Sequence, residues 1–202
     1  MAAKTNTRAA ILHATTELFR EFGYRGTALK QISSRSGAPP GSVYHHFPGG
    51  KAQIAAAALK KSGEGYKQLV FAVLTHSTDI RRGVAAVFKS GAKVLEDSGY
   101  IDPCPIGAVA REIASSHPEL RQVAHEVMDD WVVDAGKVMR QANLADLDSK
   151  AINDLATLLV AAIEGGFLLS RAAQSPEPML AAGRAFGSAL QSLMAGGALH
   201  DR

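Results

Sequence analysis

A short stretch near the N-terminus carries side chains that can recognise a polyanion. Its sequence is Pro40-Gly41-Ser42-Val43-Tyr44-His45-His46-Phe47. Its leading end is small, so a ligand can approach the backbone closely. The Tyr44 hydroxyl and the imidazoles of His45 and His46 can then hydrogen-bond to phosphates or base edges. Val43 and Phe47 are four residues apart and are expected to anchor the segment to a core.

Two short helices joined by a glycine-containing turn are expected to position this stretch. Thr27 is predicted to cap the first of them with its hydroxyl, and Gly37 to end it. The chain then turns through Ala38-Pro39, and Pro40 opens the next helix, where its missing N–H costs nothing. The longer helix before them has a predicted buried stripe of Ile11, Thr15, Leu18, Phe19 and Phe22. This arrangement is a helix-turn-helix, whose second short helix can enter the major groove of DNA.

The rest of the sequence also predicts helices. Gly, Pro, Asp and Ser separate the apolar-periodic segments, and no segment shows sustained alternation, so no strands are expected. The predicted later helices span residues 51–74, 79–96, 106–116, 118–141, 150–174 and 177–198. The sequence therefore predicts an all-α fold of about nine helices.

The charge of the chain is unevenly distributed. Its 202 residues have a net charge of +3, with 47% hydrophobic and 20% charged residues, which is typical of a globular protein. Nine Lys or Arg against two acids give the first 61 residues a charge of +7 and leave −4 for the remainder. Such asymmetry indicates that the first part meets a polyanion, although a solvated basic surface would have the same composition.

Several features indicate a cytoplasmic protein. The N-terminus lacks the apolar stretch of a signal peptide. No uninterrupted apolar run reaches the roughly 18–20 residues of a membrane span, and the nearest candidate, 158–169, is broken by Glu164. A lone cysteine, Cys104, cannot form an internal disulfide.

The motif resembles the DNA-binding signature of the TetR family across residues 5–60. The matching positions are Phe19, Gly23, Tyr24, Thr27, Ile32, Gly37, the stretch 41–47 and Lys51. The stretch 44–51 and the later Asp102-Pro103-Cys104-Pro105-Ile106 are similar to the branch that contains lincomycin-resistance and quercetin-responsive repressors.

The resemblance implies roles for the matching residues. Thr27 and Tyr44 would bind phosphates, and Lys51 would bind another with help from the dipole of the helix that it opens. His46 would either contact phosphate or pack within the domain. Bases or their sugars would be contacted by Lys30, Gln31, Pro40, Gly41, Ser42 and His45.

Two positions depart from the family pattern. Pro39 stands where a capping Ser is common. Pro40 stands where a basic or polar residue that contacts DNA bases is common. Direct hydrogen-bond readout is therefore expected to be sparse, with DNA shape and contacts to thymine methyl groups contributing more. Arg25 and Arg35 could contact phosphates or remain solvated.

The C-terminal helices predict a homodimer. Residues 155–169 are apolar on nearly every side, so this helix is expected to be buried both in the core and in a subunit interface. The resemblance likewise implies that the last two helices pair across a twofold axis, which predicts a palindromic operator. Small and large residues favour close approach of these helices, namely Ala161, Ala162, Gly165, Gly166, Gly183, Phe186, Gly187 and Leu190.

The resemblance also implies that the middle helices enclose a small-molecule effector. Aromatic or flexible side chains could line this cavity, and each of them could instead pack in the core. They are Phe71, Phe88, Met128, Trp131 and Phe167. Glu164 could bind a cationic ligand group, pair with an Arg or lie beside solvent. Cys104 could sense oxidants or be a structural thiol.

Sequence and resemblance together predict a DNA-binding transcriptional regulator that a small hydrophobic ligand releases from its operator. Residues 1–50 would form the DNA-binding domain, continuing into the helix from 51, and 51–202 the effector-binding and dimerisation domain. An architectural DNA-binding protein without effector, or an activator of the same fold, are the alternatives. An enzyme is not expected, because Gly49-Gly50-Lys51 lacks the other residues of a phosphate-binding loop and no G-x-S-x-G or H-E-x-x-H motif occurs. No cofactor or metal is expected.

Overall fold

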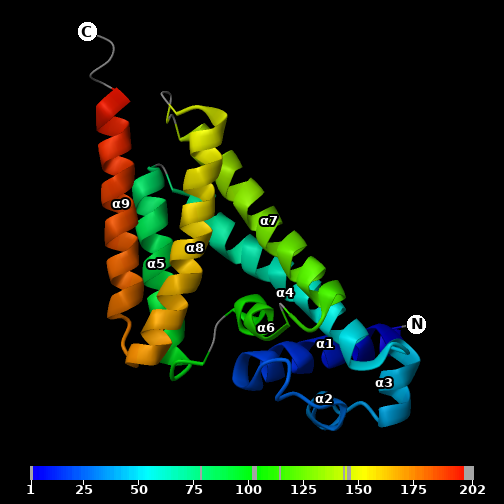
Figure 1. Cartoon of the computed structure of the whole chain (residues 1–202). Helices are drawn as coiled ribbons and strands as arrows, with labels where there is room; N and C mark the ends of the chain where they lie inside the picture. The colour runs from blue at the N-terminus through cyan, green and yellow to red at the C-terminus, as the bar shows by residue number, and fades with distance from the viewer. Residues whose placement is uncertain are drawn as a thin grey trace. The chain divides into compact units, whose positions relative to one another are not determined.

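The computed structural model describes residues 2–77, 79–101, 104–113, 115–142, 144 and 147–197. These described residues form nine α-helices and no strand, which confirms the predicted fold class (Figure 1). The helices are α1 (Ala2–Phe22), α2 (Leu29–Ser36), α3 (Pro40–His46), α4 (Gly50–Thr75), α5 (Ile80–Asp97), α6 (Pro105–Ile113), α7 (Pro118–Gln141), α8 (Ser149–Ala173) and α9 (Glu177–Gly197).

The helices group into two compact units. The first runs to Tyr66 and adds Cys104–Val127, so it contains α1, α2, α3, α6 and the beginnings of α4 and α7. The second consists of the stretches that begin at Lys67 and at Met128, and it contains α5, α8 and α9. The predicted functional domains, 1–50 and 51–202, are not the same as these two compact units. The functional division after residue 50 therefore stays a prediction.

The core of the first unit joins the first three helices to the start of α4. Its buried members are Ile11, Leu12, Leu18, Ile32, Ala38, Val43, Phe47, Ile54 and Ala58. Four residues of the predicted α1 stripe are buried, but the prediction for Phe22 is wrong, because this side chain is 50% exposed. Phe22 is the last residue of α1, and its Cβ lies beside Gly26 in the following turn instead of in the core.

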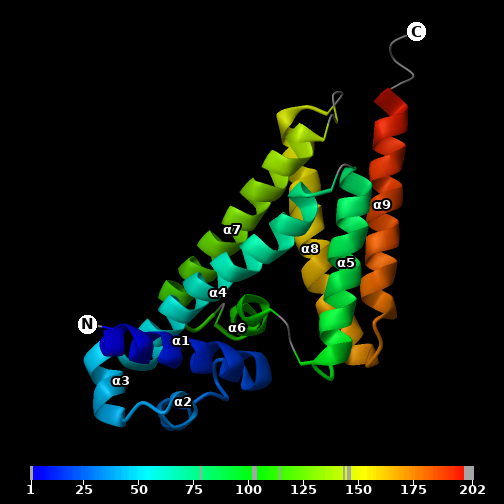
Figure 2. The ribbon, with the colours of Figure 1, turned by 180° about the vertical axis from the view of Figure 1, so that it is seen from behind.

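The second unit is built on the packing of α5 and α8 against α9. Figures 1 and 2 show α5 and α9 side by side along most of their lengths. Asp79 and Asp148 cap α5 and α8, because their carboxylates accept the N–H groups of Arg81 (2.8 Å) and Ala151 (2.7 Å). These side chains fix the N-terminal ends of two long helices.

Glycines allow α9 to approach its neighbours closely. A Cβ on Gly183 would lie 2.6 Å from the Cβ of Phe88 on α5, and one on Gly166 of α8 would overlap the sulfur of Met179. The Ser170 hydroxyl accepts the Met179 N–H at 3.0 Å, which satisfies a buried donor near the start of α9. Gly166 and Gly183 therefore serve packing within one chain.

By length and composition alone, α8 could cross a membrane. One such helix is weak evidence, since the core helix of a soluble protein has the same properties. Within the second unit, α8 buries one face that includes Leu159, Ile163 and Phe167, as a core helix does.

Candidate nucleic-acid interface

The turn between α2 and α3 is fixed by serine side chains. Gly37 ends α2 in the left-handed conformation with a φ of 68°. The Ser33 hydroxyl donates to the Ala38 carbonyl at 2.6 Å, and the Ser36 oxygen accepts the Ala38 N–H at 3.3 Å. These bonds satisfy the backbone of the turn and hold the two helices at one angle.

One face of α3 is anchored in the core of the first unit. Val43 and Phe47 are buried, as the spacing predicts. The guanidinium of Arg8 lies 5.2 Å from the centre of the Phe47 ring and covers its outer side. Since these contacts hold one face of α3, its opposite face is presented outward.

The leading end and outer face of α3 are open. Pro39 is the N-cap and makes no side-chain capping bond, and Pro40 and Gly41 are exposed. No atom lies within 4 Å of the position that a Gly41 Cβ would occupy. Tyr44 is 54% exposed and His45 is exposed, so the structure brings these predicted contact residues together on one surface. Small residues at the tip leave room for a DNA backbone or base edge.

Ser42 and His46 are more enclosed than the other residues of α3. Both are half-buried. The His46 ring lies edge-on to the His45 ring, with 5.4 Å between the ring centres. The centre of the Phe47 ring is 6.5 Å from that of His46. This packing supports the intradomain alternative for His46 more than a phosphate contact.

Thr27 has a different local role from the predicted one. The cap prediction is wrong, because Ala28 is the N-cap of α2 and the Thr27 hydroxyl donates to the Gly23 carbonyl at 2.7 Å. Thr27 is only 1% exposed, so its hydroxyl closes the turn after α1. The Thr27 N–H also donates within this turn, to the Tyr24 carbonyl at 3.3 Å, so the predicted phosphate contact of Thr27 would require the turn to open.

The predicted α2 contacts are both exposed, and among the described residues only Gln31 has its head group in a hydrogen bond. Lys30 lies on the exposed face of α2. Gln31 is also exposed, but its Oε1 accepts the Ala28 N–H at 2.6 Å and thereby caps α2. Its amide nitrogen is the part of the side chain that remains for DNA.

Lys51 lies against aromatic rings at the start of α4. Its Nζ is 4.3 Å from the centre of the Tyr24 ring, which in turn packs edge-on against His117 at 4.9 Å. Burial lowers the pKa of Lys51 below its usual range, and the nearby Glu112 carboxylate opposes this shift. The cation is thus positioned at a helix N-terminus, where an anion is also stabilised by the helix dipole.

Glu112 of α6 holds the turn that leads to α2. Its Oε2 accepts the Arg25 N–H at 2.7 Å, and a Cβ on Gly23 would overlap its carboxylate. Gly23 has a φ of 70°, which glycine adopts readily. Sequence reasoning missed Glu112, because 87 residues separate it from Arg25.

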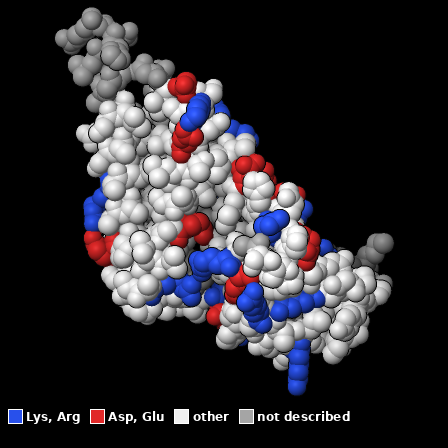
Figure 3. All heavy atoms as spheres, viewed as in Figure 1, with Lys and Arg blue, Asp and Glu red and all other residues white. Residues whose placement is uncertain are grey.

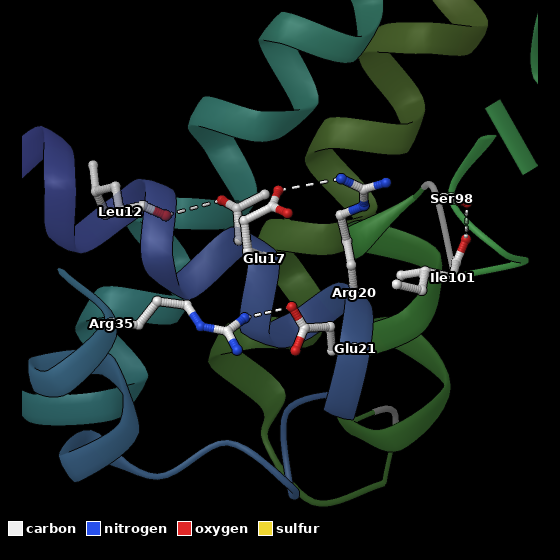
Figure 4. Close-up of polar contacts among 8 residues, drawn as sticks. Leu12, Glu17, Arg20, Glu21, Arg35, Ser98 and Ile101 are labelled. Atoms are coloured by element: carbon white, nitrogen blue, oxygen red, sulfur yellow. Dashed lines mark hydrogen bonds and ion pairs between the residues drawn. The ribbon is translucent and has the colours of Figure 1, made fainter.

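A basic side chain projects from the edge where α2 lies, and acidic and basic side chains lie close together elsewhere on the same face (Figure 3). Arg35 forms an ion pair with Glu21, and Arg20 one with Glu17 at 3.2 Å (Figure 4). Glu21 therefore already neutralises Arg35, which weakens the case for Arg35 as a phosphate contact.

The predicted pocket residues occupy several environments. Phe88, Trp131 and Phe167 are buried in the second unit. Phe71, Met128 and Glu164 are half-buried there. Cys104 belongs to the first unit, where it is buried and its sulfur accepts the Gly107 N–H at 3.3 Å. Asp102 and Pro103 of the similar motif lie outside the described residues.

The predicted dimer residues divide between interior and surface. Gly166, Gly183, Phe186 and Leu190 are buried within the chain, so little of their surface is left for a partner. Ala161 is exposed, Ala162, Gly165 and Gly187 are half-buried, and a Cβ on Gly165 or Gly187 would meet nothing within 4 Å. Leu158, Leu168 and Leu169 of the apolar stretch 155–169 are exposed, and sequence reasoning missed the exposed Leu193 and Met194 of α9.

Comparison with known proteins agrees with this arrangement. Residues 11–58 match the description "Bacterial regulatory proteins, tetR family", and residues 81–185 match "Transcriptional regulator LmrA/YxaF-like, C-terminal domain". The HTH-type transcriptional regulator LmrA of Bacillus subtilis is 35% identical over 87% of this chain and 92% of its own. YxaF of the same organism is 32% identical over 89% and 93%.

Solved structures share the fold. A TetR transcriptional regulator from Chloroflexus aurantiacus has a TM-score of 0.80 at 24% identity, covering 95% of this chain and 97% of its own. A regulatory protein TetR from Rhodobacter sphaeroides has a TM-score of 0.79 at 20% identity, with 89% and 96% covered. The chain belongs to the tetR family of bacterial regulatory proteins and is a helix-turn-helix transcriptional regulator with an LmrA/YxaF-like C-terminal domain.

Proposed function

We propose that the protein is a cytoplasmic, non-enzymatic repressor that binds a palindromic operator as a homodimer and leaves it when a small molecule binds its second part. Repression is the typical role in this family. The observation that carries the DNA-binding step is the open leading end of α3, with Gly41 exposed and Tyr44 and His45 beside it. A rigid helix with a small tip can enter the major groove closely enough to contact base edges.

A structural neighbour supports operator DNA as the partner. A cysteine variant of the TetR family regulator CifR has been solved with 26 bp of double-strand operator DNA; it has a TM-score of 0.75 at 20% identity, covering 89% of this chain and 94% of its own. By analogy, α3 of this chain would lie in the major groove. Lys51 would contact a phosphate beside it.

Exposed apolar residues on α8 and α9 support the homodimer. Leu158, Leu168 and Leu169 lie on α8, and Leu193 lies on α9. Contiguous apolar patches on a soluble protein mark interaction surfaces. A twofold pairing through these helices would hold two copies of α3 for the two halves of a palindrome.

Substitution of Gly41 by Gln tests the DNA-binding step. The free chain has space for the new side chain, so folding should be unaffected, whereas the bound DNA would meet it. Affinity for the operator, measured by fluorescence anisotropy, should fall about tenfold or more, since close contacts to base edges are lost. Gly65→Gln on α4 is the matched control, because it also has open space around its Cβ. Equal affinities of the two variants would contradict the proposed role of α3.

A further inference from the structure

The second unit has a groove between α5 and α9, whose cationic residues none of the predicted roles uses. Its volume is about 1000 Å³. Figure 2 shows these two helices side by side. Its floor is apolar and includes Phe88, Ala92, Leu180 and Gly183. The volume is at the upper end of the roughly 300–1,000 Å³ that small-molecule sites occupy.

The rim of this groove is basic. Its cations are Arg81, Arg82, Lys89, Lys93 and Arg184, against the carboxylates of Asp79 and Glu96. An apolar floor with a cationic rim complements a molecule that has an apolar body and an anionic group.

Some of these cations already have partners. Arg81 forms an ion pair with Asp79 at 2.6 Å, Lys93 one with Asp97 at 2.9 Å, and Arg184 one with Glu177. Within the part of the chain that the structure describes, Arg82 and Lys89 lie within ion-pairing distance of no carboxylate. Both cations are exposed, and although the charge of Arg82 also acts on Asp79, neither is held in an ion pair, so both can bind an anion.

Arg82 and Lys89 lie on the same face of α5. Seven residues separate them, which is about two helical turns or roughly 10 Å along the axis. Between them, Ala85 and Phe88 border the groove with apolar surface. A flexible hydrocarbon chain can follow this surface while its anionic end reaches either cation.

We propose that the α5–α9 groove binds an anionic amphiphile with an alkyl chain and a carboxylate or sulfate head group. The groove binds its apolar chain, and Arg82 or Lys89 binds its head group. Binding in this groove does not depend on the proposed function. The further statement that such a molecule is the effector rests on the proposed function. Phe88 is the one residue of the predicted aromatic pocket that borders this groove.

Isothermal titration calorimetry with the full chain and sodium decanoate, kept below its micelle concentration, tests the proposal. Decanoate should bind once per chain, and decyltrimethylammonium, which has the same chain length and the opposite charge, should bind at least about tenfold more weakly because the rim is cationic. The double variant Arg82→Glu/Lys89→Glu should lose about tenfold or more in decanoate affinity. Equal binding of the two probes, or decanoate binding that the double variant retains, would overturn the proposal.

Two further variants test separately how the net charge of the chain and the open volume of the groove affect decanoate binding. Lys137→Glu/Lys150→Glu makes the same change in net charge at exposed positions outside the groove, and should leave decanoate binding unchanged. Ala85→Trp should fill the groove and abolish binding without any change in charge. If sedimentation shows that the Arg82→Glu/Lys89→Glu variant has lost self-association, a second copy of the chain covers the groove and the proposal fails.

The operator complex separates this proposal from the proposed function. Decanoate should release the wild-type chain from operator DNA but not the Ala85→Trp variant. Groove binding without release would contradict the ligand-released function and leave the site intact, whereas release that survives Ala85→Trp would place the effector elsewhere and overturn the groove as its site.

Discussion

The surroundings of Lys51 favour the phosphate contact that we propose for this cation. The Tyr24 ring lies 4.3 Å from its Nζ, and burial lowers its pKa. Partial desolvation strengthens the attraction of this cation for an anion. Its place at the start of α4 adds the favourable dipole of a long helix.

Substitution of Lys51 by Ala should weaken operator binding and change its salt dependence. Each neutralised phosphate contributes about 0.9 to the slope of log affinity against log salt concentration, so the slope should fall in magnitude by about one. Anisotropy titrations over a series of KCl concentrations measure this slope. Lys61→Ala, at an exposed position further along α4, is the control and should leave the slope as it is. An unchanged slope for Lys51→Ala would mean that Lys51 touches no phosphate.

Among the elements, α6 determines how the turn after α1 is held. The Glu112 carboxylate accepts the Arg25 N–H and packs on Gly23, and this turn leads into α2. Close contacts between α1 and α6 accompany this bond. The position of the helix-turn-helix therefore depends on a residue far from it in sequence.

Glu112→Ala should loosen the turn without unfolding α1 or α2. A hydrogen bond to a charged group is worth about 1.5–3 kcal/mol, so exchange of the Arg25 amide should accelerate about tenfold or more. Amide hydrogen exchange followed by NMR gives this rate. Glu112→Gln keeps an acceptor oxygen and should show a smaller effect. The same exchange rate in wild type and Glu112→Ala would show that the bond does not hold the turn.

Helix bounds were predictable because breakers are local. Gly37 and the adjacent Pro39 and Pro40 define the helix-turn-helix, and all nine predicted helices are present. Val43 and Phe47 are buried as their four-residue spacing predicts. What a residue does in its own turn or its own helix could thus be inferred from neighbours in sequence.

Predictions that depended on tertiary contacts were less successful. The cap predicted for Thr27 was wrong for a local reason, because its hydroxyl bonds to Gly23, four residues earlier, and Ala28 is the N-cap of α2. Small residues on α8 and α9 predicted a dimer interface, but Gly166 and Gly183 receive side chains of their own chain, Met179 and Phe88. The groove between α5 and α9 depends on which helix faces meet, and sequence periodicity does not specify this.

At the scale of the whole molecule, the proposed function requires two chains. Exposed apolar side chains such as Leu169, at 59% exposure, would be covered in a dimer. Leu169→Glu should give a monomer in sedimentation velocity, because a charge buried at an interface without a partner is strongly unfavourable. Its operator affinity should fall with the loss of the dimer. Leu69→Glu on α4, at 65% exposure, is the matched control and should remain dimeric. A wild-type monomer, or a dimer that survives Leu169→Glu, would contradict this interface.

Selection of bound fragments from a random-sequence DNA library, repeated at two salt concentrations, tests sequence-specific binding by a twofold dimer most directly. We expect one palindromic motif, with half-site centres about one helical turn or a multiple of it apart. Its affinity should exceed that for unrelated DNA by a ratio on the order of 10³ or more. Uniform recovery of fragments, with salt dependence alone, would contradict a specific regulator and indicate an architectural DNA-binding protein.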